Sequence, residues 1–294
     1  MRWMTIGSNQ YMNMLGDRYP FNLFVPECSG TTIFQPHWHE KCLEIIYMIQ
    51  GSAEFHIGGT SYIGTSGDLF LIGEGVIHGA YLIDEPPQYY TILLDRYSLV
   101  RSDFNSVEYG ALLTGKLSLP TLIQPEHENY ETLTPIVISI IEEFIHHEPG
   151  YESAVKSYLH ILLTKLYRFY GCSTQPNQRK QEADRLKMER LKDAISFVEG
   201  HYQEQVTLGQ AAMIAGMSEY HFCRVFKHTV GRTFNEYVQL YRIGQAEIML
   251  NQTDLSISRI AEQAGFGSIH YFDKLFKRYR GCSPLQYRKR VRNG

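Results

Sequence analysis

Three histidines and a glutamate in the first half of the chain have types and spacings that could do chemistry. They are His37, His39, Glu44 and His78. Three imidazoles and a carboxylate together suit iron, manganese, zinc, nickel or copper. His37 and His39 fall on one face of a strand, because strand side chains alternate with a period of two. Glu44 breaks this parity, so a turn is expected near residues 40–42.

The residues that must position this group follow a short alternating pattern with frequent glycines. Apolar residues alternate with polar ones after Gly51, and Gly58-Gly59 predicts a two-residue hairpin turn. The expected strands cover residues 43–49, 53–57, 61–63, 69–72 and 89–94. Strands at this spacing, with turn signals between them, predict an antiparallel barrel or sandwich.

The same residues resemble the two sequence motifs of the cupin superfamily. The first motif, H-x-H-x4-E-x6-G, is present in full from His37. The second, G-x5-P-x-G-x2-H, runs from Gly67 to His78 with Gly73 in place of the proline, and Leu82 replaces a later asparagine. The resemblance implies a small barrel in which a metal is held by His37, His39, Glu44 and His78.

A small barrel can also hold one small molecule in its interior. Hydroxyl groups need polar partners and sugar faces stack on aromatic rings, so polar side chains beside Trp38 and Tyr47 would suit a sugar. The expected ligand-binding residues are His37, Trp38, His39, Glu44, Tyr47 and His78. This role requires no cofactor, and no catalytic residue is expected.

The last third of the chain contains an internal repeat. Five residues recur fifty positions later in the sequence, namely Phe222, Phe226, Lys227, Gly231 and Tyr237. Each copy reads as two short helices joined by a tight turn, with small alanines that let the helices approach closely. The pattern therefore predicts two helix-turn-helix motifs.

Glycines and serines mark the turns of both copies. Gly216 is expected to end a helix in the left-handed conformation, and Ser218 is expected to cap the helix that follows. Ser256 and Ser268 are the expected caps in the second copy. Residues 233–250 predict a long helix that holds the motifs apart. Two recognition helices about 34 Å apart would enter successive major-groove turns on one face of B-DNA.

The net charge of −3 hides an asymmetry between the two halves. Residues 1–179 carry 10 Lys and Arg against 19 Asp and Glu, which gives −9, whereas residues 180–294 carry 18 against 12, which gives +6. An acidic half joined to a basic half suggests that only the second half meets a polyanion. Together with the repeat, this charge favours DNA binding over a helical protein-interaction domain.

The repeat resembles the DNA-binding domain of the AraC/XylS family of transcription regulators. The resemblance covers residues 186–290, and the tail that begins AEQAGFGSIHYFDKLFKRYRGCSP at Ala261 follows the family signature closely. It implies that DNA is contacted by Tyr220, Cys223, Arg224, Lys227, Ile269, His270, Asp273, Lys274 and Lys277.

The chemistry of these side chains suggests different roles at the DNA. Arg224 is the strongest candidate for reading a base, because a guanidinium can grip guanine with two hydrogen bonds. Asp273 would repel phosphate, and it makes sense only if it accepts from a base or pairs with a neighbour. Lys227 and Lys277 suit phosphate contacts, which position a protein without reading sequence.

Helical patterns between the cupin-like motifs and the C-terminal repeat complete the expected organisation. Helical patterns cover 133–146, with Pro135 in the first turn, and 152–170, whose apolar stripe could pack on the barrel or on a second copy. A polar stretch without apolar periodicity predicts a linker over 172–185. The predicted parts are a sensing barrel over 1–100, a helical extension with candidate dimerisation helices over 101–171, the linker, and a DNA-binding domain over 186–294.

The fold class predicted from these patterns is α+β with two domains. An N-terminal antiparallel, cupin-like β-barrel with added helices precedes an all-α domain in which a long helix joins two helix-turn-helix motifs. No stretch of about 18 uncharged apolar residues exists and the N-terminus has no apolar signal segment, so a cytoplasmic protein without a membrane partner is expected. The five cysteines form no C-x-x-C pair, which favours reduced thiols.

These features predict a transcription activator rather than an enzyme. We expect a homodimer that binds double-stranded promoter DNA, acts on RNA polymerase and responds to a small molecule in the barrel, with a sugar or oligosaccharide as the expected effector. Two alternatives stay open. One is a metal- or redox-responsive regulator, and the other is a cupin metalloenzyme fused to a DNA-binding tail.

Overall fold

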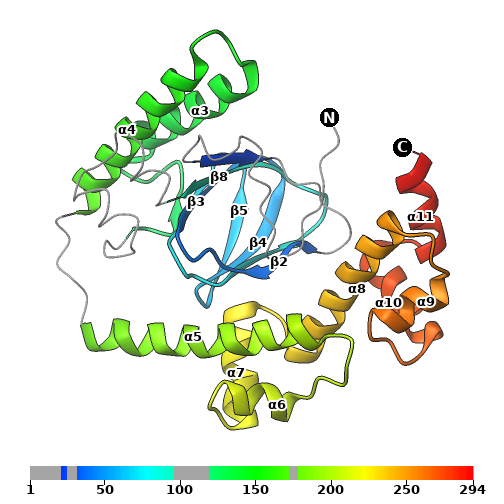
Figure 1. Ribbon diagram of the computed structural model, residues 1–294. Helices are drawn as coiled ribbons and strands as arrows, with labels where there is room; N and C mark the ends of the chain where they lie inside the picture. The colour runs from blue at the N-terminus through cyan, green and yellow to red at the C-terminus, as the bar shows by residue number, and fades with distance from the viewer. Residues whose placement is uncertain (1–20, 25–31, 96–118, 172–177, 294) are drawn as a thin grey trace.

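The computed structural model describes residues 21–24, 32–95, 119–171 and 178–293. The first part of the chain forms two antiparallel sheets that face each other (Figure 1). One sheet has the order β1 (Phe21–Phe24), β8 (Gln88–Asp95), β3 (Cys42–Gln50), β6 (Leu69–Ile72) and β9 (Leu122–Ile123). The other has the order β2 (Thr32–His37), β7 (His78–Leu82), β4 (Ser52–Ile57) and β5 (Thr60–Thr65). In the described residues the strands thus form two sheets rather than one closed ring.

Strand alternation decides which side chains fill the space between the sheets. In β3, Ile46 and Met48 point into the core that both sheets share, whereas Leu43 and Ile45 point to the outer face. The turn Gly58-Gly59 joins β4 to β5 with φ of +58° and +89° at the two glycines, as the hairpin prediction requires.

The outer face of the β1–β8–β3–β6–β9 sheet is covered by two antiparallel helices. They are α3 (Tyr130–His146) and α4 (Tyr151–Tyr170), and they lie above the sheets in Figure 1. The predicted apolar stripe is buried here, since Val155, Leu159 and Leu162 pack against the sheet. Helix α3 begins one turn earlier than predicted, so Pro135 lies in its second turn rather than its first.

The C-terminal part is all helical. Its elements are α5 (Gln178–His201), α6 (Leu208–Ile214), α7 (Glu219–Val230), α8 (Phe234–Gln252), α9 (Ile257–Gln263), α10 (Ile269–Arg280) and α11 (Pro284–Asn293). Helix α5 begins inside the segment for which the sequence predicts a linker. The segment lacks an apolar stripe, but Gln, Arg, Lys, Glu and Ala are good helix formers, so a polar helix is compatible with its composition.

Two clusters of buried side chains hold these helices together. One joins α5, α6, α7 and the start of α8, and the other joins the rest of α8 with α9 and α10. The long helix α8 therefore contributes to both cores and separates the two motifs, as the sequence predicts. No helix of the described residues is both long and apolar enough to cross a membrane. The predicted two-domain α+β fold class is confirmed.

Candidate functional site

Four ligand-type side chains converge where β2, β3 and β7 meet. We call His37, His39, Glu44 and His78 the His–Glu cluster, and one potential ligand atom from each lies within 4.8 Å of the others. His37 ends β2 directly opposite His78 at the start of β7. The chain bends at residues 40–41, where a turn is expected, and this brings Glu44 of β3 into the same space.

The hydrogen bonds of the cluster orient the imidazoles toward its centre. Nδ1 of His37 donates to the carbonyl of Gln35, and Nδ1 of His78 donates to the carbonyl of Val76, both at 2.8 Å. Because Nδ1 of each ring carries the proton, Nε2 is the nitrogen left for a ligand or an ion pair. Glu44 Oε2 lies 2.7 Å from His78 Nε2 and 3.1 Å from His39 Nε2.

Burial and mutual charge shift the pKa values of the cluster in different directions. Burial lowers the pKa of His37 well below its usual value, and the neighbouring His78 lowers it further. Burial alone would raise the pKa of Glu44, but attraction to His78 and the close approach of the His39 imidazole hold it well below its ordinary value. Burial opposes the charge of His78, yet Glu44 outweighs burial and raises the pKa of His78. The site therefore favours an ionised carboxylate.

The residues present fit a divalent transition metal. Glu44 Oε2 and His78 Nε2 are buried and lie 2.7 Å apart. Their relative orientation is not that of a hydrogen bond, so neither atom is satisfied by the other. Three imidazoles and one carboxylate form a donor set that such metals accept. Backbone carbonyls behind two of the rings are the kind of support that metal-ligating histidines have.

Trp38 and Tyr47 do not join the cluster, although the sequence predicts that both bind the ligand. Trp38 directly follows the end of β2 and lies outside the cluster, where it packs against the C-terminal helices. Tyr47 has the opposite parity to Glu44 and packs on the side of α3 and α4. The aromatic ring beside the cluster is instead Phe34, whose centroid lies 5.4 Å from that of His37.

The first helix-turn-helix motif consists of α6 and α7. Thr207 and Gln210 form a reciprocal capping box at the start of α6. The turn contains Gly216 with φ of +62°, and Ser218 caps α7 by accepting from the backbone N–H of His221. Both turn residues do what the sequence predicts.

The second motif repeats this construction with α9 and α10. The side chains of Ser256 and Ser268 accept from the backbone N–H groups of Arg259 and Tyr271, so both predicted caps are present. Gly265 adopts φ of +82° in the turn.

The predicted DNA-contacting residues all lie on exposed faces of the two recognition helices. Tyr220 is 81 % exposed and Ile269 is 39 % exposed. The remaining ones are also exposed, namely Cys223, Arg224, Lys227, His270, Asp273, Lys274 and Lys277. The phenylalanines that recur fifty positions apart are fully buried, namely Phe222, Phe226, Phe272 and Phe276. Each helix thus has one face for packing and one free of the domain core.

Sequence reasoning missed a contact between the two domains. The Tyr81 hydroxyl of β7 donates to the carbonyl of Val230 at the end of α7, at 2.7 Å and buried. The guanidinium of Arg232 lies 4.0 Å from the centre of the Tyr81 ring. Lys192 of α5 is 5 % exposed and lies 3.5 Å from Glu40 beside the His–Glu cluster. No local pattern marks these residues, because their partners are far away in the sequence.

The exposed thiol of Cys223 offers a direct test of the DNA-binding face. We expect N-ethylmaleimide to abolish specific DNA binding of the wild-type protein, because the adduct would lie beside Arg224. The variant Cys223→Ala should keep binding after the same treatment. Cys42 should stay unmodified in peptide mass mapping at pH 7, since burial raises the pKa of its thiol to about 12. Equal loss of binding in both proteins would remove Cys223 from the interface.

Comparison with known proteins finds two family models that together span most of the chain. The AraC-like ligand binding domain matches residues 27–163, and a helix-turn-helix domain matches residues 211–290. The chain is 24 % identical over 270 residues to the uncharacterized HTH-type transcriptional regulator YdeC of Bacillus subtilis, covering 89 % of this chain and 91 % of the relative. It is 25 % identical over 289 residues to the HTH-type transcriptional activator RhaR of Enterobacter, covering 95 % and 92 %.

Solved structures are similar to parts or most of the chain. The DNA-binding domain of AdpA in complex with a target DNA is 29 % identical, with a TM-score of 0.35, and covers 35 % of this chain and 94 % of that one. A point variant of apo ToxT from Vibrio cholerae is 17 % identical, with a TM-score of 0.43, and covers 93 % and 98 %. Because both domains match and the relatives are transcriptional regulators, the chain belongs to the AraC-type family of DNA-binding transcriptional regulators.

Proposed function

We propose that this regulator is an activator whose affinity for promoter DNA depends on a small molecule bound at the His–Glu cluster. The observation that carries the proposal is the pairing of a buried polar cluster in one domain with two exposed recognition helices in the other. A related protein of similar length, RhaR, is named an activator. The effector must bind two arrangements of the domains with different affinity, since otherwise it could not shift their equilibrium.

The DNA-binding part of the proposal rests on the repeat. Helices α7 and α10 each present a polar face, and the shared helix α8 fixes their separation. Side chains on these faces would read bases, while lysines such as Lys227 and Lys277 would contact phosphates. A palindromic target would suit a homodimer, and the outer face of α4 offers a surface for it because Ile161 is 45 % exposed. RNA polymerase is the proposed partner in activation.

A sugar or oligosaccharide is the effector that we propose. The His–Glu cluster would provide buried hydrogen-bond partners for its hydroxyl groups, and Phe34 would provide an apolar surface beside them. This chain would then bind its effector without transforming it. Its relatives are regulators, and we propose no reaction for the cluster.

A metal-responsive regulator is the second candidate function. It is favoured because Glu44 Oε2 and His78 Nε2 are buried without a satisfying hydrogen bond. His37, His39, Glu44 and His78 would hold the metal, which would act as a Lewis acid toward effector oxygens. The backbone carbonyls of Gln35 and Val76 would keep two of the rings in the ligating tautomer.

A thermal-shift screen of the full chain tests the proposal. The panel contains mono- and oligosaccharides and divalent metals, each with and without chelator. A ligand at a hundred times its dissociation constant should stabilise the protein by about 2.7 kcal/mol. A shift with one sugar that a chelator leaves unchanged supports the sugar effector, and a shift that needs metal supports the second candidate. Glu44→Gln should abolish either shift, and a ligand shift that survives this change would contradict binding at the cluster.

A further inference from the structure

The outer face of the β2–β7–β4–β5 sheet packs on the first helix-turn-helix motif. Alternation turns Tyr81 of β7 and His56 of β4 away from the barrel core and toward α7. Figure 1 shows the sheets between α3 and α4 on one side and α5 and α7 on the other. The buried hydrogen bond from Tyr81 to Val230 and the stacking of Arg232 on the Tyr81 ring make this contact specific rather than only apolar.

The close approach depends on a glycine at the end of α7. Gly231 has φ of +79°, and a Cβ atom placed there would lie 2.5 Å from the imidazole of His56. Gly281, its equivalent in the second motif, has φ of +71°, but a Cβ atom there would meet nothing within 4 Å. The two glycines end equivalent helices with the same backbone conformation. Only Gly231 is pressed against the barrel.

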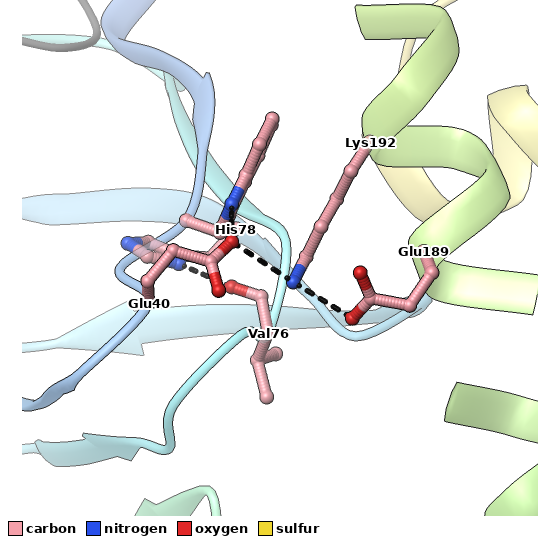
Figure 2. Close-up of polar contacts among 6 residues, drawn as sticks. Glu40, Val76, His78, Glu189 and Lys192 are labelled. Carbon is pink, nitrogen blue, oxygen red and sulfur yellow. Dashed lines mark hydrogen bonds and ion pairs between the residues drawn. The ribbon is translucent and has the colours of Figure 1, made fainter. Parts of the chain in front are cut away.

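A second part of the contact adjoins the His–Glu cluster. Lys192 lies between Glu40 and Glu189 in Figure 2, at 3.5 Å and 3.1 Å from their carboxylates. Glu40 directly follows His39 in the chain. Ile77, which precedes His78, is fully buried in the core of α5, α6 and α7. The loop residues next to His39 and His78 therefore also contact the DNA-binding domain.

The contact brings the β4–β5 hairpin to the DNA-binding side of α7. One surface crevice is lined by His56, Gly59, Thr60 and Ser61 of the hairpin together with Arg224, Lys227 and His228 of α7. A Cβ atom at Gly59 would lie 3.2 Å from the ring of His228. Arg224 and Lys227 are two of the residues expected to contact DNA. The major groove is about 12 Å wide and a helix with its side chains is about 10–12 Å across, so the groove has little room for a hairpin beside the helix.

We infer that docking of the barrel on α7 is an autoinhibitory contact. In the docked arrangement the hairpin occupies space that DNA needs at Arg224 and Lys227, and release of the barrel frees the first recognition helix. The second recognition helix, α10, lies away from the hairpin in Figure 1. The inference rests on the proposed function, since it presumes that α7 binds DNA. It adds that the effector acts through the loops that join the His–Glu cluster to α5.

Gly231→Ala and Gly281→Ala form a matched pair that tests this inference. Both variants place a side chain at a positive φ, so both carry similar backbone strain. Only Gly231→Ala also pushes His56 away. In the full-length protein we expect Gly231→Ala to raise affinity for a DNA site selected from a random pool by roughly fivefold to tenfold. Small-angle scattering should show a larger radius of gyration. Gly281→Ala should change neither quantity in this direction.

Tyr81→Phe tests the same contact without changing the backbone, so the test does not depend on correct folding of Gly231→Ala. It removes one hydroxyl and leaves the Val230 carbonyl without its partner, so DNA affinity and radius should again rise. Fluorescence anisotropy measures the affinity. Equal effects of the two glycine variants, or a Tyr81→Phe protein that is as compact and binds DNA no tighter than the wild type, would overturn the autoinhibitory contact. If no variant binds DNA, the proposed function fails as well, so the two failures are distinguishable.

Discussion

Replacing Glu247 by alanine should destabilise the second helix-turn-helix motif by about 3–5 kcal/mol, because it leaves a buried guanidinium without its partner. Glu247 of α8 pairs with Arg280 at the end of α10, and the two side chains are 9 % and 5 % exposed. Arg280 donates from both Nε and Nη2, the latter at 2.6 Å. Hydrogen exchange of the α10 amides would measure the loss, since it reports the opening of this domain alone.

A double variant and a surface pair provide the controls for this prediction. Glu247→Leu combined with Arg280→Met removes both charges and keeps apolar volume, so it should recover most of the stability. Glu262→Ala breaks the pair with Arg259, which has the same 2.6 Å distance but is 67 % and 55 % exposed. That change should cost less than about 1 kcal/mol. Similar losses at both sites would show that burial does not govern the Glu247 pair.

Replacing Arg224 by alanine is expected to weaken specific DNA binding by about 1–3 kcal/mol if its guanidinium grips a base. Lys227→Ala should act differently, because a phosphate contact carries no sequence information. It should weaken binding to all sequences about equally and reduce the slope of log affinity against log salt by about 1. Both side chains are exposed on the same face of α7.

Titrations of a selected site and of random DNA at several salt concentrations separate these two roles. Arg168→Ala serves as the control, because it removes an exposed cation from α4 in the other domain. Its DNA affinity should match the wild type. If Arg224→Ala weakens selected and random DNA equally, Arg224 contacts phosphate and does not read sequence.

The features that the sequence predicts well depend on neighbours in the chain. A serine cap needs only an N–H group three residues away, and the Gly58-Gly59 hairpin needs only a positive φ at two adjacent residues. The same holds for the repeat, since burial of Phe222 and Phe272 follows from helical periodicity. The sequence also predicts the His–Glu cluster for a related reason. Strand parity and one turn bring Glu44 to His37 and His39, and the resemblance to the cupins adds His78.

The errors have particular physical causes. Chemical type alone assigns Trp38 and Tyr47 to the ligand site, but Trp38 packs against the C-terminal helices, and alternation from Glu44 within β3 turns Tyr47 toward α3 and α4. The start of helix α5 escapes prediction because its first residues have helical propensity but no apolar stripe. A stripe indicates packing against a neighbour, and a helix can form without one.

By itself, the sequence determined the two-domain α+β fold, the duplicated recognition helices and the identity of the cluster residues, because each follows from short-range periodicity, capping or a motif. Only the tertiary structure decided how the domains meet. Tyr81 and Val230 are 149 residues apart, and Glu247 and Arg280 belong to different helices. Such contacts depend on how whole elements pack, and the exposed or buried state of a tyrosine, lysine or arginine is set by the partner that it finds there.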